Sequence, residues 1–246
     1  MIRSFYTAGT GMLTQRDRMD VLTNNLTNAD TTGFKSDSLV LRGFKDIMIS
    51  MYSGTRASGT VGMLGNGAHN SRVITSFMQG SLEGTGRSLD FALEGDGFFV
   101  VSTPGGERYT RDGSFSVSSD GYLLSSGGYY VQGQNARIYV GGDGFAVNEE
   151  GNVSVNGAVT DRIRIVRFEN AASLRKDGNN LYTSGVRPLQ DNDTKVMQGF
   201  IEGSNVDISG ELTNMLAVSR SYETNQRVLR MVDGTLEKSV NSIGRI

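Results

Sequence analysis

Residues able to support catalysis or bind metals are scarce in this sequence of 246 residues. It contains no cysteine and no tryptophan, and His69 is its one histidine. The lack of cysteine excludes disulfides, thiolate zinc sites, iron–sulfur clusters and thiol nucleophiles. A single histidine excludes sites built from several imidazoles. It leaves one candidate imidazole base, which lies in a glycine-rich stretch and is expected to be solvated.

Acidic residues are more frequent, but their spacing favours turns over metal sites. In the central region, five aspartates each precede a glycine: Asp96, Asp112, Asp120, Asp143 and Asp177. None lies in an EF-hand loop pattern, and Asp-Gly pairs are typical of tight hairpin turns. The nearest match to a phosphate-binding loop, GTGRS at 84–88, lacks the lysine. The distance between the two catalytic carboxylates of a glycosidase is set by the fold and not by sequence spacing. A glycosidase site therefore remains an open alternative. We expect no enzyme activity, no cofactor and no metal site.

The charge balance and the apolar runs narrow the range of partners. Lys plus Arg number 24 against 26 for Asp plus Glu, giving a formal net charge of -2. This balance argues against a nucleic-acid partner. The longest apolar run in the middle of the chain, residues 98–101, is far below the ~20 residues that span a bilayer. The first 20 residues lack the apolar core of a cleavable secretory signal. Membrane insertion is therefore not expected.

The N-terminal region has apolar residues at helical spacing. A heptad walk from Ile2 places Phe5, Met12, Met19 and Leu26 on one stripe. Such a stripe is typical of an amphipathic helix. Two readings stay open at this point: the helix packs on its own domain, or it packs against another chain.

The C-terminal region predicts a longer helix. Asp207 or Ser209 is a candidate N-cap, Gly244 a candidate stop, and the helix would reach ~50 Å. Its apolar heptad stripe comprises Leu212, Met215, Tyr222, Leu229, Leu236, Val240 and Ile243. Polar residues at Ser219, Gln226 and Asp233 interrupt the stripe, which favours an interface with several partners over a simple two-helix coil. We expect this helix to pack with the N-terminal one in a coiled-coil-like helical domain.

The central region changes to short β-branched and aromatic runs separated by glycine turns. These turns recur every 7 to 10 residues, as in an antiparallel sandwich or barrel. We therefore expect an α+β protein with four segments. Residues 1–52 form the N-terminal helix, a helix-stop loop and an extended segment, and residues 53–70 form a Gly/Ser-rich linker. Residues 71–200 form an all-β antiparallel domain, and residues 201–246 carry the C-terminal helix.

One short stretch, LTNNLTNADTTGFK at 22–35, is rich in residues that end helices. The side chains of Asn24, Asn25 and Asn28 can bond nearby backbone groups, Gly33 can adopt a left-handed conformation, and Phe34 can anchor the chain after the turn. An ordinary helix-stop loop would account for this composition.

This stretch also resembles the N-terminal signature of bacterial flagellar rod and hook proteins. Two further segments are similar to family signatures, in the family's order. They are SLDFALEGDGFFVV with YTRDGSF and GYLLSSGGYYV, within 88–131, and GSNVDISGELTNMLAVSRSYETNQRV at 203–228. Thr23 and Thr27 stand where the family usually has alanine. The modest length favours rod subunits over the longer hook subunit. Distal rod subunits are the most similar, and proximal ones are nearly as similar.

The resemblance implies a structural axial subunit in the rod of the flagellar basal body, outside the cytoplasmic membrane. Such a subunit is exported by the flagellar type III apparatus and polymerises into a hollow helical shaft. The implied partners are further copies, other rod and hook proteins, the export apparatus and an outer ring. The implied interface combines both helical stripes with Asn24, Asn25, Asn28, Gly33 and Phe34. The alternative from the residues alone is a carbohydrate-binding or enzymatic β domain with helical oligomerisation tails. A phage-tail-like or adhesin subunit is a further rival.

Overall fold

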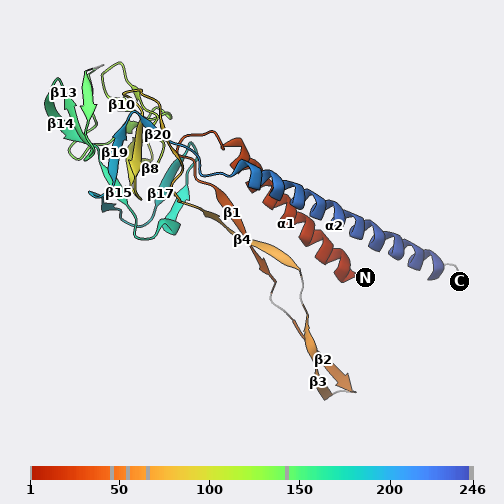
Figure 1. Cartoon of the computed structure of the whole chain (residues 1–246). Coiled ribbons are helices and arrows are strands. Elements are labelled where there is room, and N and C mark those ends of the chain that lie inside the picture. Colours follow the sequence, from red (N-terminus) through yellow and green to blue (C-terminus); the bar gives the residue numbers. More distant parts are fainter. Residues whose placement is uncertain (1, 45–46, 54–55, 65–66, 142–143, 244–246) are drawn as a thin grey trace. The chain divides into compact units, whose positions relative to one another are not determined.

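A computed structural model of the chain describes residues 2–44, 47–53, 56–64, 67–141 and 144–243. They form two compact units, here called the helix unit and the β unit. The helix unit comprises Met1–Thr27, Asp37–Ile74 and Asp207–Ile246, and the β unit comprises Asn28–Ser36 and Thr75–Val206. The α+β class is confirmed, because a helix lies near each end of the chain and an antiparallel β body lies between them in sequence (Figure 1).

Two long helices, α1 (Ile2–Thr27) and α2 (Ile208–Ile243), lie side by side in the helix unit (Figure 1). They run antiparallel, because Gly11 lies against Asn225 while Asn25 hydrogen-bonds Glu211. With 26 residues against 36, α1 is about 15 Å shorter than α2 at 1.5 Å per residue. Part of α2 therefore extends beyond the first residue of α1.

The ends of both helices follow the sequence signals. The carboxylate of Asp207 accepts a hydrogen bond from the Ser209 backbone N–H at 3.1 Å, so Asp207 is the residue that caps α2. Helix α1 ends at Thr27, inside the predicted helix-stop stretch, and a turn follows it. Gly244, the expected stop of α2, lies outside the described residues.

The helix unit also contains strands, and here the structure differs from the predicted linker at 53–70. Strand β1 (Asp37–Gly43) pairs with β4 (Ala68–Thr75), and β2 (Ile47–Ser53) pairs antiparallel with β3 (Arg56–Leu64). The glycine-rich composition of 53–70 suggested a flexible linker, but a strand needs backbone partners more than apolar side chains. The β2 strand supplies those partners to β3. Residues 54–55 and 65–66 of the expected linker lie outside the described residues.

The β unit is built from short antiparallel strands, as predicted for the central region. Its largest sheet runs in the order β16-β17-β8-β7-β11-β10-β9, and β15 pairs with both β7 and β18. Three smaller sheets pair β12-β13-β14, β19-β6 and β20-β5. The bounds are β5 (Leu82–Gly84), β6 (Phe91–Glu94), β7 (Phe98–Thr103), β8 (Gly106–Thr110), β9 (Ser116–Val117), β10 (Leu123–Leu124), β11 (Tyr130–Val131), β12 (Phe145–Val147), β13 (Asn152–Val155), β14 (Ala158–Arg162), β15 (Ile165–Arg167), the 3-10 turn η1 (Ala171–Ser173), β16 (Leu174–Lys176), β17 (Leu181–Ser184), β18 (Leu189–Gln190), β19 (Lys195–Gln198) and β20 (Phe200–Glu202).

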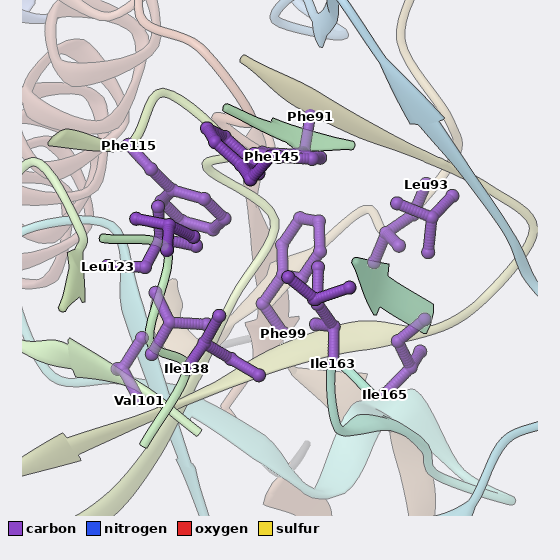
Figure 2. Close-up of a cluster of buried hydrophobic side chains, with 14 of the residues drawn as sticks. Phe91, Leu93, Phe99, Val101, Phe115, Leu123, Ile138, Phe145, Ile163 and Ile165 are labelled. Carbon is purple, nitrogen blue, oxygen red and sulfur yellow. The ribbon is translucent and has the colours of Figure 1, made fainter. Parts of the chain in front are cut away.

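Strand β7 divides the core of the β unit into two clusters. Its side chains alternate between the faces of the sheet, so Phe99 and Val101 join one cluster while Phe98 and Val100 join the other. Figure 2 shows the first cluster, in which Phe99 lies among apolar side chains from several strands. Both faces of β7 are covered along its first four residues, so this part of its sequence is an unbroken apolar run, Phe98–Val101, and does not alternate with polar residues.

Candidate subunit interface and its anchoring junction

The two helices bury a narrow seam against each other. On α1, Ala8, Leu22 and Asn25 are buried and recur at heptad spacing together with Gly11, while Thr14 is buried off this spacing. On α2, Val218 is buried. A Cβ added at Gly11 would lie 3.0 Å from the Asn225 side-chain amide, so the helices approach closely there. This seam lies one residue away from the stripe predicted for α1.

The predicted α1 stripe is therefore only partly covered within the chain. Phe5 is 45% exposed, and Met12, Met19 and Leu26 are half-buried. Leu13, next to the stripe, is also largely exposed. These apolar side chains leave one flank of α1 without a complete apolar cover in the described chain.

The predicted α2 stripe is divided in the same way. Its half-buried members Met215, Leu229 and Leu236 share the heptad register of buried Val218, whereas other members are exposed. The exposed apolar residues of α2 are Ile208, Leu212, Leu216, Tyr222, Met231 and Val240. Ile243 ends α2, and its side chain lies outside the described residues.

An open groove of about 460 Å³ lies beside α1 in the helix unit. Gly9 is part of its lining, and nothing stands within 4 Å of the place where a Cβ at Gly9 would be. Most of the other lining residues are apolar or aromatic. The lining comprises Phe5, Tyr6, Gly9, Thr10, Met12, Leu13, Arg16 and, from α2, Tyr222.

Asn25 joins three elements of the helix unit by hydrogen bonds from a fully buried amide. Its Nδ2 donates to the Asp37 carbonyl oxygen at 2.8 Å and to Glu211 Oε1 at 3.0 Å. Its Oδ1 accepts from the Asp37 backbone N–H at 2.9 Å. One side chain of α1 therefore holds the start of β1 and the first turn of α2. Its neighbour Asn24 is exposed.

Replacing Asn25 with aspartate is expected to destabilise the helix unit by about 2–4 kcal/mol at neutral pH. The change removes both donated hydrogen bonds and places a second carboxylate beside Glu211. Denaturant unfolding followed by far-UV circular dichroism measures the loss. The matched control is Asn214→Asp at an exposed position of α2, which should change stability by about 0.5 kcal/mol or less. Equal losses in the two variants would contradict the role of Asn25.

The β unit holds the rest of the N-terminal signature through a buried ion triad. Glu202 Oε1 accepts from Lys35 Nζ at 2.5 Å, and Glu202 Oε2 accepts from Arg111 Nη1 at 3.2 Å. All three side chains are almost fully buried. Burial lowers the pKa of Lys35 and of Arg111, and the Glu202 carboxylate opposes both shifts. Two buried cations therefore depend on one carboxylate.

Further backbone and side-chain contacts fix residues 32–36 in the β unit. The Gly33 N–H donates to the Glu202 carbonyl oxygen at 2.7 Å, and the buried Phe34 ring lies 4.1 Å from Lys176 Nζ. Asn205 Oδ1 accepts from the Ser36 N–H at 2.8 Å. Asn28 bonds Thr31 in the turn that follows α1. Gly33 and Phe34 are thus anchored inside the β unit of their own chain.

Asp112 also acts in this junction, which corrects its reading as an ordinary turn residue. It is buried, and its Oδ1 accepts from the Thr32 hydroxyl at 2.7 Å. Its Oδ2 accepts from the Ser126 hydroxyl. A turn aspartate would bond only its neighbours, whereas this one reaches 80 residues back along the chain. Asp143, another of the five turn aspartates, lies outside the described residues.

We call this cluster the signature junction, because it brings together the three sequence signatures. Residues 32–35 come from the first and Ser36 directly follows it, 111–112 come from the second, and 202–205 border or open the third. Sequence reasoning missed Lys35, Arg111, Glu202 and Asn205 as functional residues. Lys35, Arg111 and Asn205 lie inside the quoted signatures, and Glu202 directly precedes one. The signatures are therefore the sequence feature that could have identified these residues.

His69 is exposed, and its ring lies 4.8 Å from that of Phe44. Within the described ranges, no three His, Cys, Asp or Glu side chains gather as metal ligands would. Likewise, neither described helix combines the length and apolarity needed to cross a bilayer.

Comparisons with known proteins match the same regions. Three family models cover residues 5–35 (Flagella basal body rod protein), 92–155 (Flagellar hook protein FlgE/F/G D1 domain) and 197–243 (Flagellar basal body rod FlgEFG protein C-terminal). The flagellar basal-body rod protein FlgG of Bacillus subtilis is 32% identical over 98% of this chain and 99% of its own length. The chain belongs to the flagellar basal-body rod protein family. This membership makes it a structural rod subunit and places it in the flagellar basal body.

Members of the rod family with different names are similarly related to this chain. The flagellar basal-body rod protein FlgF of Caulobacter vibrioides is 33% identical over 100% of this chain and 98% of its own length. The flagellar hook-basal body complex protein FlhO of Bacillus subtilis is 30% identical over the full length of both chains. The family is therefore shown along the whole chain, and the signature junction lies within or beside the regions matched by the family models.

Proposed function

We propose that this rod-family subunit is exported by the flagellar type III apparatus and polymerises into a hollow helical shaft that transmits torque. The distal rod is its preferred place, with the proximal rod as the alternative. The observation that carries the proposal is the set of exposed apolar side chains on both helices, including Phe5, Leu13 and Leu216. Apolar faces of this kind mark interaction surfaces, and identical copies supply the cover.

The free energy gained by burying apolar side chains favours assembly through these faces. Full burial of a Leu, Phe or Met side chain contributes about 1.5–3 kcal/mol. Several such residues per subunit, each buried on a neighbour, offset the entropy of ordering two long helices.

The interface residues divide into two roles under this proposal. Phe5, Leu212, Tyr222 and Val240 contact neighbouring subunits directly, since they are exposed. The half-buried members, Met12, Met19, Leu26, Met215, Leu229 and Leu236, support α1–α2 pairing of coiled-coil type and contribute their open flanks. Asn25 and the signature junction, with Gly33 and Phe34, fix the segments that lead to these helices.

Partners and chemistry follow from the same assignment. Other rod and hook subunits lie above and below in the shaft, the export apparatus handles the chain before assembly, and an outer ring surrounds the β units. The β2–β3 hairpin is proposed to bridge neighbouring subunits. Catalysis and bound cofactors have no part in this function.

Truncating one exposed leucine tests the assembly proposal. Leu216 is 63% exposed on α2, so Leu216→Ser should leave the monomer folded and raise the critical concentration for tube formation about 10-fold or more. Electron microscopy and sedimentation of the concentrated protein measure this. The matched control is Val159→Ser, which removes an equally exposed apolar side chain from the β unit and should assemble normally. Closed soluble oligomers in the wild type would contradict the shaft and favour a β domain with oligomerisation tails.

A further inference from the structure

The helix unit carries two distinct apolar surfaces that nothing in the described chain covers. The first is the groove beside α1, whose lining includes Phe5, Gly9 and Leu13. The second is the row Ile208, Leu212 and Leu216, spaced four residues apart on α2 and exposed at each position. Side chains at i, i+4 and i+8 lie one above the other on a helix, so they form a ridge. One surface is hollow and the other projects.

The register between the helices separates these surfaces along the helix pair. Gly11 lies against Asn225 and Asn25 against Glu211, so Gly9 is level with about residue 227 of α2. Leu212 is then about 15 residues away, or about 22 Å. The ridge of one molecule therefore cannot enter the groove of the same molecule. Each surface needs a different copy.

We propose that the groove of one subunit receives the ridge of a second copy, in a head-to-tail contact staggered by about 20 Å along the helices. This inference rests on the proposed rod function and specifies the contact that builds the polymer. Because the two surfaces differ, each bound copy still presents a free groove or a free ridge. Such a heterologous contact does not close on itself as a two-fold dimer does, and it generates an open helical array.

The chemistry of the two surfaces is complementary. Gly9 leaves the groove open, and the ridge supplies branched aliphatic side chains to fill it. Among the described residues, Arg16 is the one charged residue that lines the groove, and it is exposed although it also pairs with Asp17 at 2.8 Å. The start of α2 carries Asp207 and Glu211 and no basic residue before Arg220. Attraction between Arg16 at the edge of the groove and the acidic start of α2 favours contact between the groove and the ridge.

Filling the groove provides the first test. Gly9→Leu occupies the open space without a clash and replaces glycine by a better helix former, so the monomer should fold normally. We expect its critical concentration for tube formation to rise at least 10-fold. The matched control is Gly234→Leu, since Gly234 lies inside α2 and also has nothing within 4 Å of an added Cβ. Circular dichroism of both monomers checks that they fold.

Disulfide trapping provides the second test, and the cysteine-free chain makes it clean. The variants Gly9→Cys and Leu212→Cys, mixed and oxidised under assembly conditions, should form a crosslinked dimer that neither gives alone. The double variant should give a ladder of trimers, tetramers and higher species. Because a disulfide needs Cα atoms within about 7 Å, no bond can form inside one chain. The control pair, Gly9→Cys with Lys238→Cys, should give at least 10-fold less crosslinking.

The outcomes separate the contact from the function. Wild-type tubes together with unaffected Gly9→Leu assembly and no 9–212 crosslink would overturn the groove–ridge contact and leave the rod function standing. Crosslinked dimers without higher species in the double variant would also overturn it, because they indicate a closed two-fold contact. Absence of any wild-type polymer at high concentration would overturn the proposed function itself.

Discussion

Replacing Glu202 with glutamine is expected to lower the free energy of unfolding of the β unit by about 3–5 kcal/mol at neutral pH. Glu202 is the one anion of the buried triad, so its loss leaves Lys35 and Arg111 as two buried cations. It also weakens the bond from the Gly80 N–H, which lies 2.9 Å from Glu202 Oε1. Denaturant unfolding of the full chain, followed by near-UV circular dichroism of the tyrosines, measures the loss.

The matched control for Glu202 is the substitution Lys35→Met. This change leaves the neutral pair Arg111–Glu202 and removes two hydrogen bonds, those from Lys35 Nζ to Glu202 Oε1 and to the Met78 carbonyl oxygen. We expect a loss of about 1–2 kcal/mol. The difference between the two variants measures the cost of an uncompensated buried charge. If Lys35→Met were as damaging as Glu202→Gln, the charge argument would be wrong and only packing would matter.

The Glu202→Gln variant should also have its own pH dependence. Burial already lowers the pKa of Lys35 below 10.5, and removing the carboxylate lowers it further. Between that lowered pKa and 10.5, the unfolded chain binds a proton that the folded chain lacks, so the free energy of unfolding rises with pH. The stability gap to the wild type should therefore narrow from neutral pH to about pH 10. A gap that stays constant would show that Lys35 keeps its proton.

The sequence predicts the existence of the helices well and the buried face of α1 less well. Hydrophobicity selects the stripe with Phe5, Met12 and Met19, because these are the large apolar residues. The helices instead bury the adjacent stripe, in which Ala8 and Gly11 are small. Small residues allow close approach of two backbones, and no hydrophobicity count reveals that preference. The large residues then remain for other subunits under the proposed function.

The signature junction shows a different limit of sequence reasoning. The signatures were visible as motifs, but their partners are far apart, since Lys35 and Glu202 are 167 residues apart and Thr32 and Asp112 are 80 apart. Turn rules account for local bonds of Asn, Asp and Gly, so Asp112 was expected to be a turn residue. Only the fold shows that it bonds Thr32. The sequence analysis did not predict strand β3 for the same reason. The backbone groups of β3 pair with those of β2, and the composition of 53–70 does not show this pairing.

A single methyl group at Gly33 should strongly destabilise the signature junction. Its φ is +64°, and an added Cβ would lie 2.5 Å from both the Arg111 carbonyl oxygen and the Asp112 nitrogen. Both atoms belong to the backbone of the junction, so no side-chain rotation relieves the clash. We expect Gly33→Ala to lower the free energy of unfolding of the β unit by about 3–5 kcal/mol, from left-handed strain and overpacking together.

The substitution Gly86→Ala separates the two causes at Gly33. Gly86 has a similar φ of +70° but nothing within 4 Å of an added Cβ, so only the backbone strain of about 1–2 kcal/mol applies. Thermal and denaturant unfolding of both variants gives the comparison. The excess loss in Gly33→Ala measures how tightly the first signature is seated against Arg111 and Asp112. Equal losses would mean that the loop at 28–36 yields easily and that the junction does not hold it rigidly.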